Sequence, residues 1–202
     1  MGLLYDKNIV LTKRTKSEKV FEELFAPLTF EQVDYKNPLD YVTKFWKQYQ
    51  KRTDKNNSLN GKIWEYIIIT LLYREGLLPF YTQAKVAFVP NVEFDVLLYT
   101  IPYPISLSLK TSLRERYKQA DLEAIALRYV HRRAKSYLLT LDPDEAGQCK
   151  EKVKSGDIIG IDRIIDCNTT DINDLIEDLK TIKKDLSVSP KIDVVEGNLI
   201  QK

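Results

Sequence analysis

Two short polar patterns within residues 93–110 could together do chemistry on a phosphodiester. In Glu93-Phe94-Asp95 and in Ser106-Leu107-Ser108-Leu109-Lys110, polar side chains alternate with apolar ones. This period of two is typical of strands, and the proline-bearing segment between them predicts a turn. Opposed residues of an antiparallel pair share a face, so Asp95 and Lys110 can meet across the ladder. A carboxylate that binds Mg²⁺ and an ammonium that orients and polarises a water are the minimum for magnesium-dependent phosphodiester hydrolysis.

The pattern resembles the PD-(D/E)xK nuclease superfamily, and within it small type II restriction endonucleases. Asp95 matches the first acid, Lys110 matches the lysine, and the resemblance covers roughly residues 59–165. Phe94 stands where the motif has proline, which affects only the shape of the strand. Ser108 stands where the motif has its second acid, and a hydroxyl is a weak substitute for a carboxylate on a hard cation.

Glu65 is a candidate for the acid that Ser108 does not supply. It lies in a predicted helix over residues 59–74 that is apolar nearly all round, as expected of a buried helix. A buried carboxylate needs a partner, which could be Lys62 or a bound cation. The resembled family has a glutamate on this helix that faces the catalytic strands. The resemblance therefore implies that Asp95, Glu65 and the carbonyl of Leu109 hold Mg²⁺.

Two alternatives remain open for these residues. Asp95 and Lys110 could form an ordinary cross-strand ion pair, which contributes only about 0–1 kcal/mol when exposed. Glu93 is a reserve ligand, because it shares a strand face with Asp95, although at that position it is expected to face solvent.

A basic segment follows the candidate catalytic lysine. Residues 110–135 carry eight basic side chains against three acidic ones, a net charge of +5, although the whole chain is only +2. Such a segment suits a phosphate backbone, and a solvated helix face is the alternative. On the predicted helix over residues 112–135, the expected DNA contacts are Arg114, Arg116, Lys118 and Gln119.

Composition narrows the class of protein. With 202 residues, 44% hydrophobic and 30% charged, the chain reads as one globular domain. Its longest apolar stretch is too short for a bilayer, and no signal-peptide pattern is found, so no membrane association is expected. Cys149 and Cys167 have only His131 as an imidazole partner, which argues against zinc and favours reduced thiols in a cytoplasm. Seven glycines form neither a P-loop nor a dinucleotide fingerprint.

Hydrophobic periodicity predicts a mixed α/β sheet with helices on both faces. The polar residues 53–58 separate an N-terminal helical elaboration, 1–58, from a nuclease core, 59–202, within one compact domain. The first 16 residues are expected to form an unpatterned arm. Helices are predicted at 17–25, 39–49, 59–74, 112–135, 143–154 and 172–186. Strands are predicted at 81–89, 93–99, 105–110, 136–141 and 158–167. The fourth strand is expected to be parallel to its neighbour, and the fifth is expected to be the last strand of the chain. The resemblance implies that this sheet is restriction-endonuclease-like.

The resemblance also implies an activity. A type II restriction enzyme would cut double-stranded DNA at a specific sequence into 5′-phosphate and 3′-hydroxyl ends, as a homodimer with a companion methyltransferase. A structure-specific or repair nuclease with the same core is a second interpretation. A non-catalytic DNA-binding protein whose site has decayed at Ser108 is a third.

Overall fold

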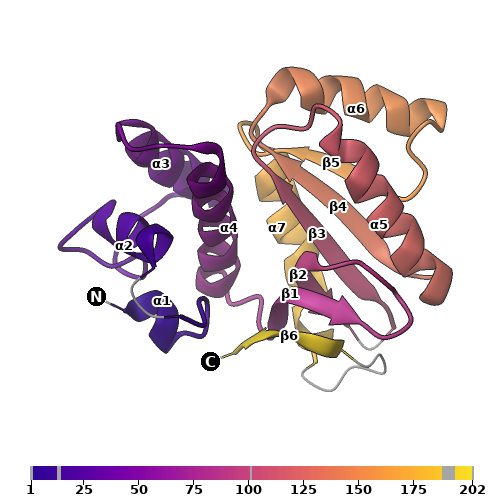
Figure 1. The fold of residues 1–202 in the computed structure, drawn as a ribbon, viewed down its shortest axis with the longest axis horizontal. Helices are drawn as coiled ribbons and strands as arrows, with labels where there is room; N and C mark the ends of the chain where they lie inside the picture. Colours follow the sequence, from indigo (N-terminus) through magenta and orange to yellow (C-terminus); the bar gives the residue numbers. More distant parts are fainter. Residues whose placement is uncertain (1, 13–14, 101, 188–193, 202) are drawn as a thin grey trace.

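The computed structural model describes residues 2–12, 15–100, 102–187 and 194–201, and a six-stranded mixed sheet lies at its centre (Figure 1). The strands lie in the order β5-β4-β3-β2-β1-β6. Their bounds are β1 Phe80–Val86, β2 Phe94–Tyr99, β3 Pro104–Lys110, β4 Lys135–Thr140, β5 Arg163–Asp166 and β6 Val194–Ile200. The first three strands form an antiparallel meander, and β3, β4 and β5 are parallel. The predicted mixed sheet, with its parallel fourth strand, is confirmed.

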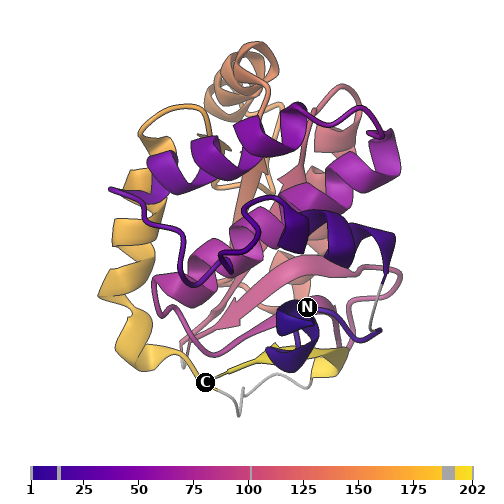
Figure 2. The same cartoon turned by 90° about the vertical axis from the view of Figure 1, so that its left-hand side faces the viewer.

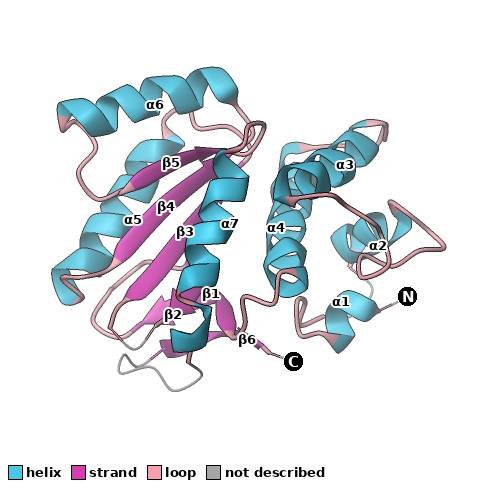
Figure 3. Cartoon of the chain, turned by 180° about the vertical axis from the view of Figure 1, so that it is seen from behind, coloured by secondary structure: helices cyan, strands magenta, loops and turns pink. Residues whose placement is uncertain are grey.

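Helices cover both faces of the sheet, as predicted. The remaining bounds are α4 Asn57–Arg74, α5 Arg116–Val130, α6 Pro143–Ser155 and α7 Asp171–Thr181. Apolar residues of α4 and α7 pack with Val96, Leu107 and Leu139 on one face. Residues of α5 and α6 pack with Leu138 and Ile164 on the opposite face. Figure 3 shows α7 across the face that Figure 1 turns away from the viewer.

Three N-terminal helices pack beside α4, on its side away from the strands (Figure 2). They are α1 Leu3–Asp6, α2 Lys16–Glu23 and α3 Pro38–Gln50. The expected N-terminal arm is wrong for the described residues before Thr15. Leu4 is fully buried, and the Glu22 carboxylate accepts hydrogen bonds from the N–H groups of Gly2 and Leu4. This side chain supplies acceptors for the free N–H groups at the start of α1.

The helix expected over residues 112–135 is shorter than predicted. It begins only at Arg116, because Arg114 has a φ of 38°, which a right-handed helix cannot contain, and the Leu113 N–H binds the Glu145 carboxylate. It ends at Val130. Five residues therefore separate the candidate lysine from the first helical turn, not one.

The expected strand over residues 158–167 is also mostly loop, and only Arg163–Asp166 pairs with β4. Side chains of α5 bind the backbone before it: the Asp121 carboxylate accepts from the Gly160 N–H, at 2.6 Å, and Arg128 donates to the Gly160 carbonyl, at 2.8 Å. Backbone groups bound in this way do not form a ladder.

The C-terminal region differs from prediction in two ways. β5 is not the last strand, because β6 pairs antiparallel with β1 at the other edge of the sheet. The helix expected to reach residue 186 ends at Thr181, and a short 3₁₀ turn, Lys183–Asp185, follows it. Within the described residues, no helix is both long enough and apolar enough to span a bilayer.

Candidate functional site

Asp95 is the second residue of β2, and its side chain contacts that of Lys110, the last residue of β3. Lys110 Nζ lies 3.0 Å from Asp95 Oδ2, and the two side chains are 16% and 17% exposed. Val96 lies opposite Leu107, so the same register places Ser108, not Lys110, opposite Asp95. The lysine therefore reaches the carboxylate along the diagonal of the ladder, a distance that a long side chain can span.

The Asp95 carboxylate is held on one oxygen only. Oδ2 accepts the ammonium of Lys110 and also the backbone N–H of Leu109, at 2.7 Å. Oδ1 accepts no hydrogen bond from any described residue. The strands thus fix the orientation of the carboxylate and leave one of its oxygens free to bind another group.

Ser108 lies beside Asp95 with an unsatisfied hydroxyl. Its Oγ is buried and has no hydrogen-bond partner in the described part of the chain. Together with Asp95 and Glu123 it lines a cavity of about 10 Å³, which is about the space of one water or small cation. A buried polar atom without a partner is rare, and it indicates room for an ordered water or an ion.

Glu123 is a candidate that sequence reasoning missed. It lies on α5, where its carboxylate accepts a hydrogen bond from Gln119 Nε2 at 2.7 Å. Burial raises the pKa of Glu123; Asp95 also raises it, whereas Gln119 and Lys110 oppose the change. The signal was its position: Glu123 precedes Ala124 of the apolar stripe on the first helix after the strand that carries Lys110, so it borders the sheet.

Glu65 lies on the other side of the pair, on α4. Its carboxylate is 2.8 Å from Lys62 Nζ and 17% exposed. Burial raises the pKa of Glu65, Lys62 opposes the change, and Asp95 and Lys110 contribute smaller effects of opposite sign. The structure therefore shows the Lys62 ion pair that was one of the two partners expected for Glu65, and it places this acid close enough to sense Asp95.

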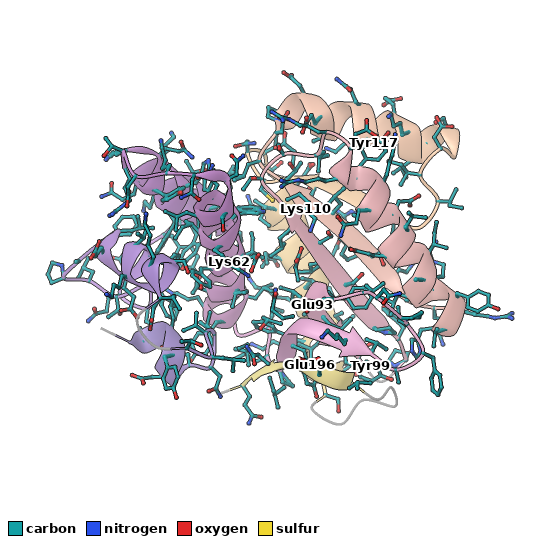
Figure 4. All side chains as sticks on the ribbon, viewed as in Figure 1. Lys62, Glu93, Tyr99, Lys110, Tyr117 and Glu196 are labelled. Carbon is teal, nitrogen blue, oxygen red and sulfur yellow. The ribbon has the colours of Figure 1, made fainter. Side chains whose placement is uncertain are left out.

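The other polar residues of the two strands lie apart from this cluster. Glu93 is exposed and lies 3.9 Å from Lys85. The Ser106 hydroxyl donates to that of Ser136, at 2.8 Å. Figure 4 shows Lys62 on α4, Lys110 on β3 and Glu93 just before β2.

The residues expected to contact DNA follow Lys110 around the turn into α5. Arg114 and Arg116 are exposed, and neither forms an ion pair within the described part of the chain. Lys118 pairs with Glu115. The Gln119 amide holds Glu123, so this residue contributes to the candidate site itself.

The oxygen atoms around Asp95 are of the type that Mg²⁺ prefers as ligands. This ion prefers hard oxygen ligands, keeps several waters, and is usually held by one or two carboxylates plus substrate phosphates. The donors here are Asp95 Oδ1, the Ser108 hydroxyl and the carboxylate of Glu65 or Glu123; the carbonyl of Leu109 remains a predicted ligand. The described residues contain no group of three or more His, Cys, Asp or Glu side chains arranged to bind a metal.

Comparisons of this chain with protein-family models, with curated proteins and with solved structures found no match.

Proposed function

We propose that this chain is a Mg²⁺-dependent endonuclease of double-stranded DNA with a restriction-endonuclease-like fold, acting as a homodimer in the manner of a type II restriction enzyme. One observation carries the proposal: the largely buried Asp95–Lys110 pair has a further acid on each side, Glu65 and Glu123. An ion pair alone is a common structural contact. Carboxyls with raised pKa gathered around such a pair are typical of functional sites.

Each residue has a role in this reaction. Asp95, Ser108, the Leu109 carbonyl and one flanking acid would hold Mg²⁺, which neutralises phosphate charge and makes a bound water more acidic. Lys110 holds the attacking water in line with the P–O3′ bond, and Asp95 fixes the position of its ammonium. The water oxygen bonds to phosphorus as the P–O3′ bond breaks. The attacking water releases one proton to the solvent and the 3′ oxygen takes one up from it, so one water is consumed and the products are a 5′-phosphate and a 3′-hydroxyl.

The remaining expectations belong to the same proposal. Arg114, Arg116 and Lys118 would bind phosphates as the duplex passes the turn into α5. Both cysteines are unpaired and buried, which suits a reducing cytoplasm. A companion methyltransferase would protect host DNA.

The test is a plasmid digest with Mg²⁺ and, in parallel, with EDTA. The wild-type protein should give discrete fragments only with the metal, and Lys110→Ala should be slower by about 10²–10⁴-fold, the usual contribution of a positioned proton-handling group. Lys85→Ala is the matched control, because Lys85 is also a strand lysine paired with an acid, Glu196 at 2.6 Å, but is half exposed.

Each result decides between the interpretations. Normal cutting by Lys110→Ala would remove the assignment. Retention of DNA without cutting would favour a non-catalytic binding protein. Cutting confined to branched or mismatched DNA would favour a structure-specific nuclease.

A further inference from the structure

A second, larger hollow lies on the α4 side of the candidate site. Its volume is about 220 Å³, and α4, β1, β6 and the segment around Ile9 and Val10 surround it. Lys62 and Glu65 form the wall nearest Asp95, and Gln83 and Asn198 contribute amides from the strands. The hollow therefore shares Glu65 with the candidate active site.

The hollow contains a buried hydroxyl, that of Thr82, without a hydrogen-bond partner among the described residues. The residue lines the hollow and is only 2% exposed, yet its Oγ1 has no hydrogen-bond partner in the described part of the chain. Burying a hydroxyl without a partner destabilises a fold, and native proteins seldom keep one without a reason. A ligand that supplies the missing hydrogen bond is such a reason.

The backbone beside Thr82 is strained in a way that shapes the hollow. Gln83 has a φ of 50°, in the left-handed region, although it lies within β1. The pairing of β1 with β6 shifts its register between Thr82 and Lys85. Strain of this kind concentrates at ligand sites, and here it turns Gln83 out of the regular alternation and into the hollow.

The lining chemistry suits a nucleobase better than a phosphate. Lys62 and Glu65 neutralise each other, so these side chains offer no surplus positive charge. The amides of Gln83 and Asn198 and the Thr82 hydroxyl can both donate and accept, as base edges require. Ile69 supplies an apolar surface for the face of a ring. At about 220 Å³ the hollow is much larger than the water-sized cavity beside Ser108, which is about 10 Å³.

We propose that this hollow receives one nucleobase of the DNA substrate, turned out of its stack beside the attacked phosphate. The inference rests on the proposed nuclease function and specifies its substrate. Thr82 pairs with Val96 and so lies on the α4 face of the sheet, opposite to the Asp95 side chain. Glu65 links the two sides, because it lines the hollow and its carboxyl also senses Asp95 and Lys110, so a base in the hollow would belong to a nucleotide near the cleavage point. Unstacking costs least at a mismatched or unpaired base. We therefore expect the protein to bind more tightly when the nucleotide at the cut is unpaired.

The experiment measures DNA binding by the full chain in EDTA, so that cleavage plays no part. Two fluorescent duplexes of one sequence are compared, one fully paired and one with a single unpaired nucleotide. The wild-type protein should bind the second about tenfold more tightly, a typical value for one recognised base. Thr82→Val and Gln83→Ala should reduce that preference below about threefold and leave binding of the paired duplex unchanged. Thr181→Val on α7 is the control, because Thr181 does not line the hollow.

The outcomes separate the two proposals. Equal binding of both duplexes by the wild-type protein, or an undiminished preference in both variants, overturns the base-binding inference while leaving the nuclease proposal standing. No binding to either duplex in EDTA, together with no plasmid cleavage in Mg²⁺, refutes the nuclease proposal itself. Thermal melting shows whether each variant is folded; Thr82→Val removes an unsatisfied hydroxyl and should melt no lower than the wild type.

Discussion

The two flanks of the Asp95–Lys110 pair each hold one acid, and they differ in what neutralises it. On α4, Glu65 lies 2.8 Å from the ammonium of Lys62. On α5, the one hydrogen bond that Glu123 receives from the described part of the chain is neutral, from Gln119 at 2.7 Å. Burial raises the pKa of both carboxyls, and both sense Asp95 and Lys110. A carboxylate with its own cation is satisfied without a ligand, whereas one that has only an amide still offers its charge to a metal.

This difference suggests a division of roles between the flanks. The α5 flank has the water-sized cavity with the unsatisfied Ser108 hydroxyl, which suits an ion. The α4 flank has the larger hollow with the unsatisfied Thr82 hydroxyl, and its Lys62–Glu65 pair forms a neutral wall that suits a base. We therefore expect the metal to lie toward Glu123, although the sequence pointed to Glu65.

The largest effect should come from exchanging the two acids for amides. Glu123→Gln should slow cleavage by about 100-fold and raise the Mg²⁺ concentration needed for half-maximal activity, since removing groups that hold a metal or its ligands costs 10–100-fold. Glu65→Gln should stay within about tenfold. Metal titrations of plasmid cleavage compare the two. The reverse order of effects would place the metal on the α4 flank.

The pH dependence should then follow Glu123. Burial raises the pKa of this carboxyl above its ordinary value of 4.5, and Asp95 adds to the effect while Gln119 and Lys110 oppose it. Only the ionised form binds a cation, so the apparent Mg²⁺ affinity should fall as pH drops through the raised pKa, about tenfold per pH unit below it. Cleavage at subsaturating Mg²⁺ measures this loss. It should persist in Glu65→Gln and be absent in Glu123→Gln; persistence in both variants would assign the titration to another group.

Sequence reasoning found the strands that carry the site because their alternation is local. The antiparallel meander, the parallel fourth strand and the Asp142 cap of α6 all follow from patterns of two to four residues. The start of α5 did not, because it depends on Glu145, which binds the Leu113 N–H from 32 positions away. β6 was missed for a related reason: a strand at an edge needs only a partner, here β1, and little pattern of its own.

The choice of the second acid, Glu65 or Glu123, also depends on contacts that local sequence patterns do not predict. The apolar surroundings of Glu65 correctly predicted that it needs a partner, and Lys62, three residues earlier, is that partner. In the sequence, Glu123 is one of the three acidic residues in the basic segment 110–135. Only the packing of α5 against β3 brings it into one cavity with Asp95. Sequence spacing predicts which residues share a face, but the choice between two facing helices is made by tertiary packing.

The path of the DNA should also distinguish the flanks, with a smaller effect. If the duplex follows the α5 flank, Arg114→Ala and Arg116→Ala should each weaken binding to all sequences and lower the slope of log affinity against log salt by about one. Lys47→Ala on α3 is the control, because Lys47 is equally exposed and unpaired among the described residues. Binding titrations from 50 to 200 mM salt measure the slopes. Loss of cognate affinity alone, with an unchanged slope, would mean that the arginine reads bases.

The smallest expected effect concerns Lys62, because its ion pair with Glu65 is what distinguishes Glu65 from Glu123. Burial works to lower the pKa of Lys62, but the attraction of Glu65 outweighs it and leaves that pKa raised, so each charge of the pair depends on the other. Lys62→Gln removes the ammonium that pairs with Glu65. Glu65 would then resemble Glu123, which has only an amide group beside it among the described residues. If the metal lies toward Glu123, the Mg²⁺ concentration for half-maximal cleavage should change by less than about threefold, because the ligands are untouched. If Glu65 is the ligand, its release from Lys62 should lower that concentration about tenfold or more. The Mg²⁺ concentration for half-maximal cleavage is measured for Lys62→Gln and for the wild type. A large decrease in the variant would show that the Lys62 ion pair, and not the distance from Asp95, prevents Glu65 from binding the metal.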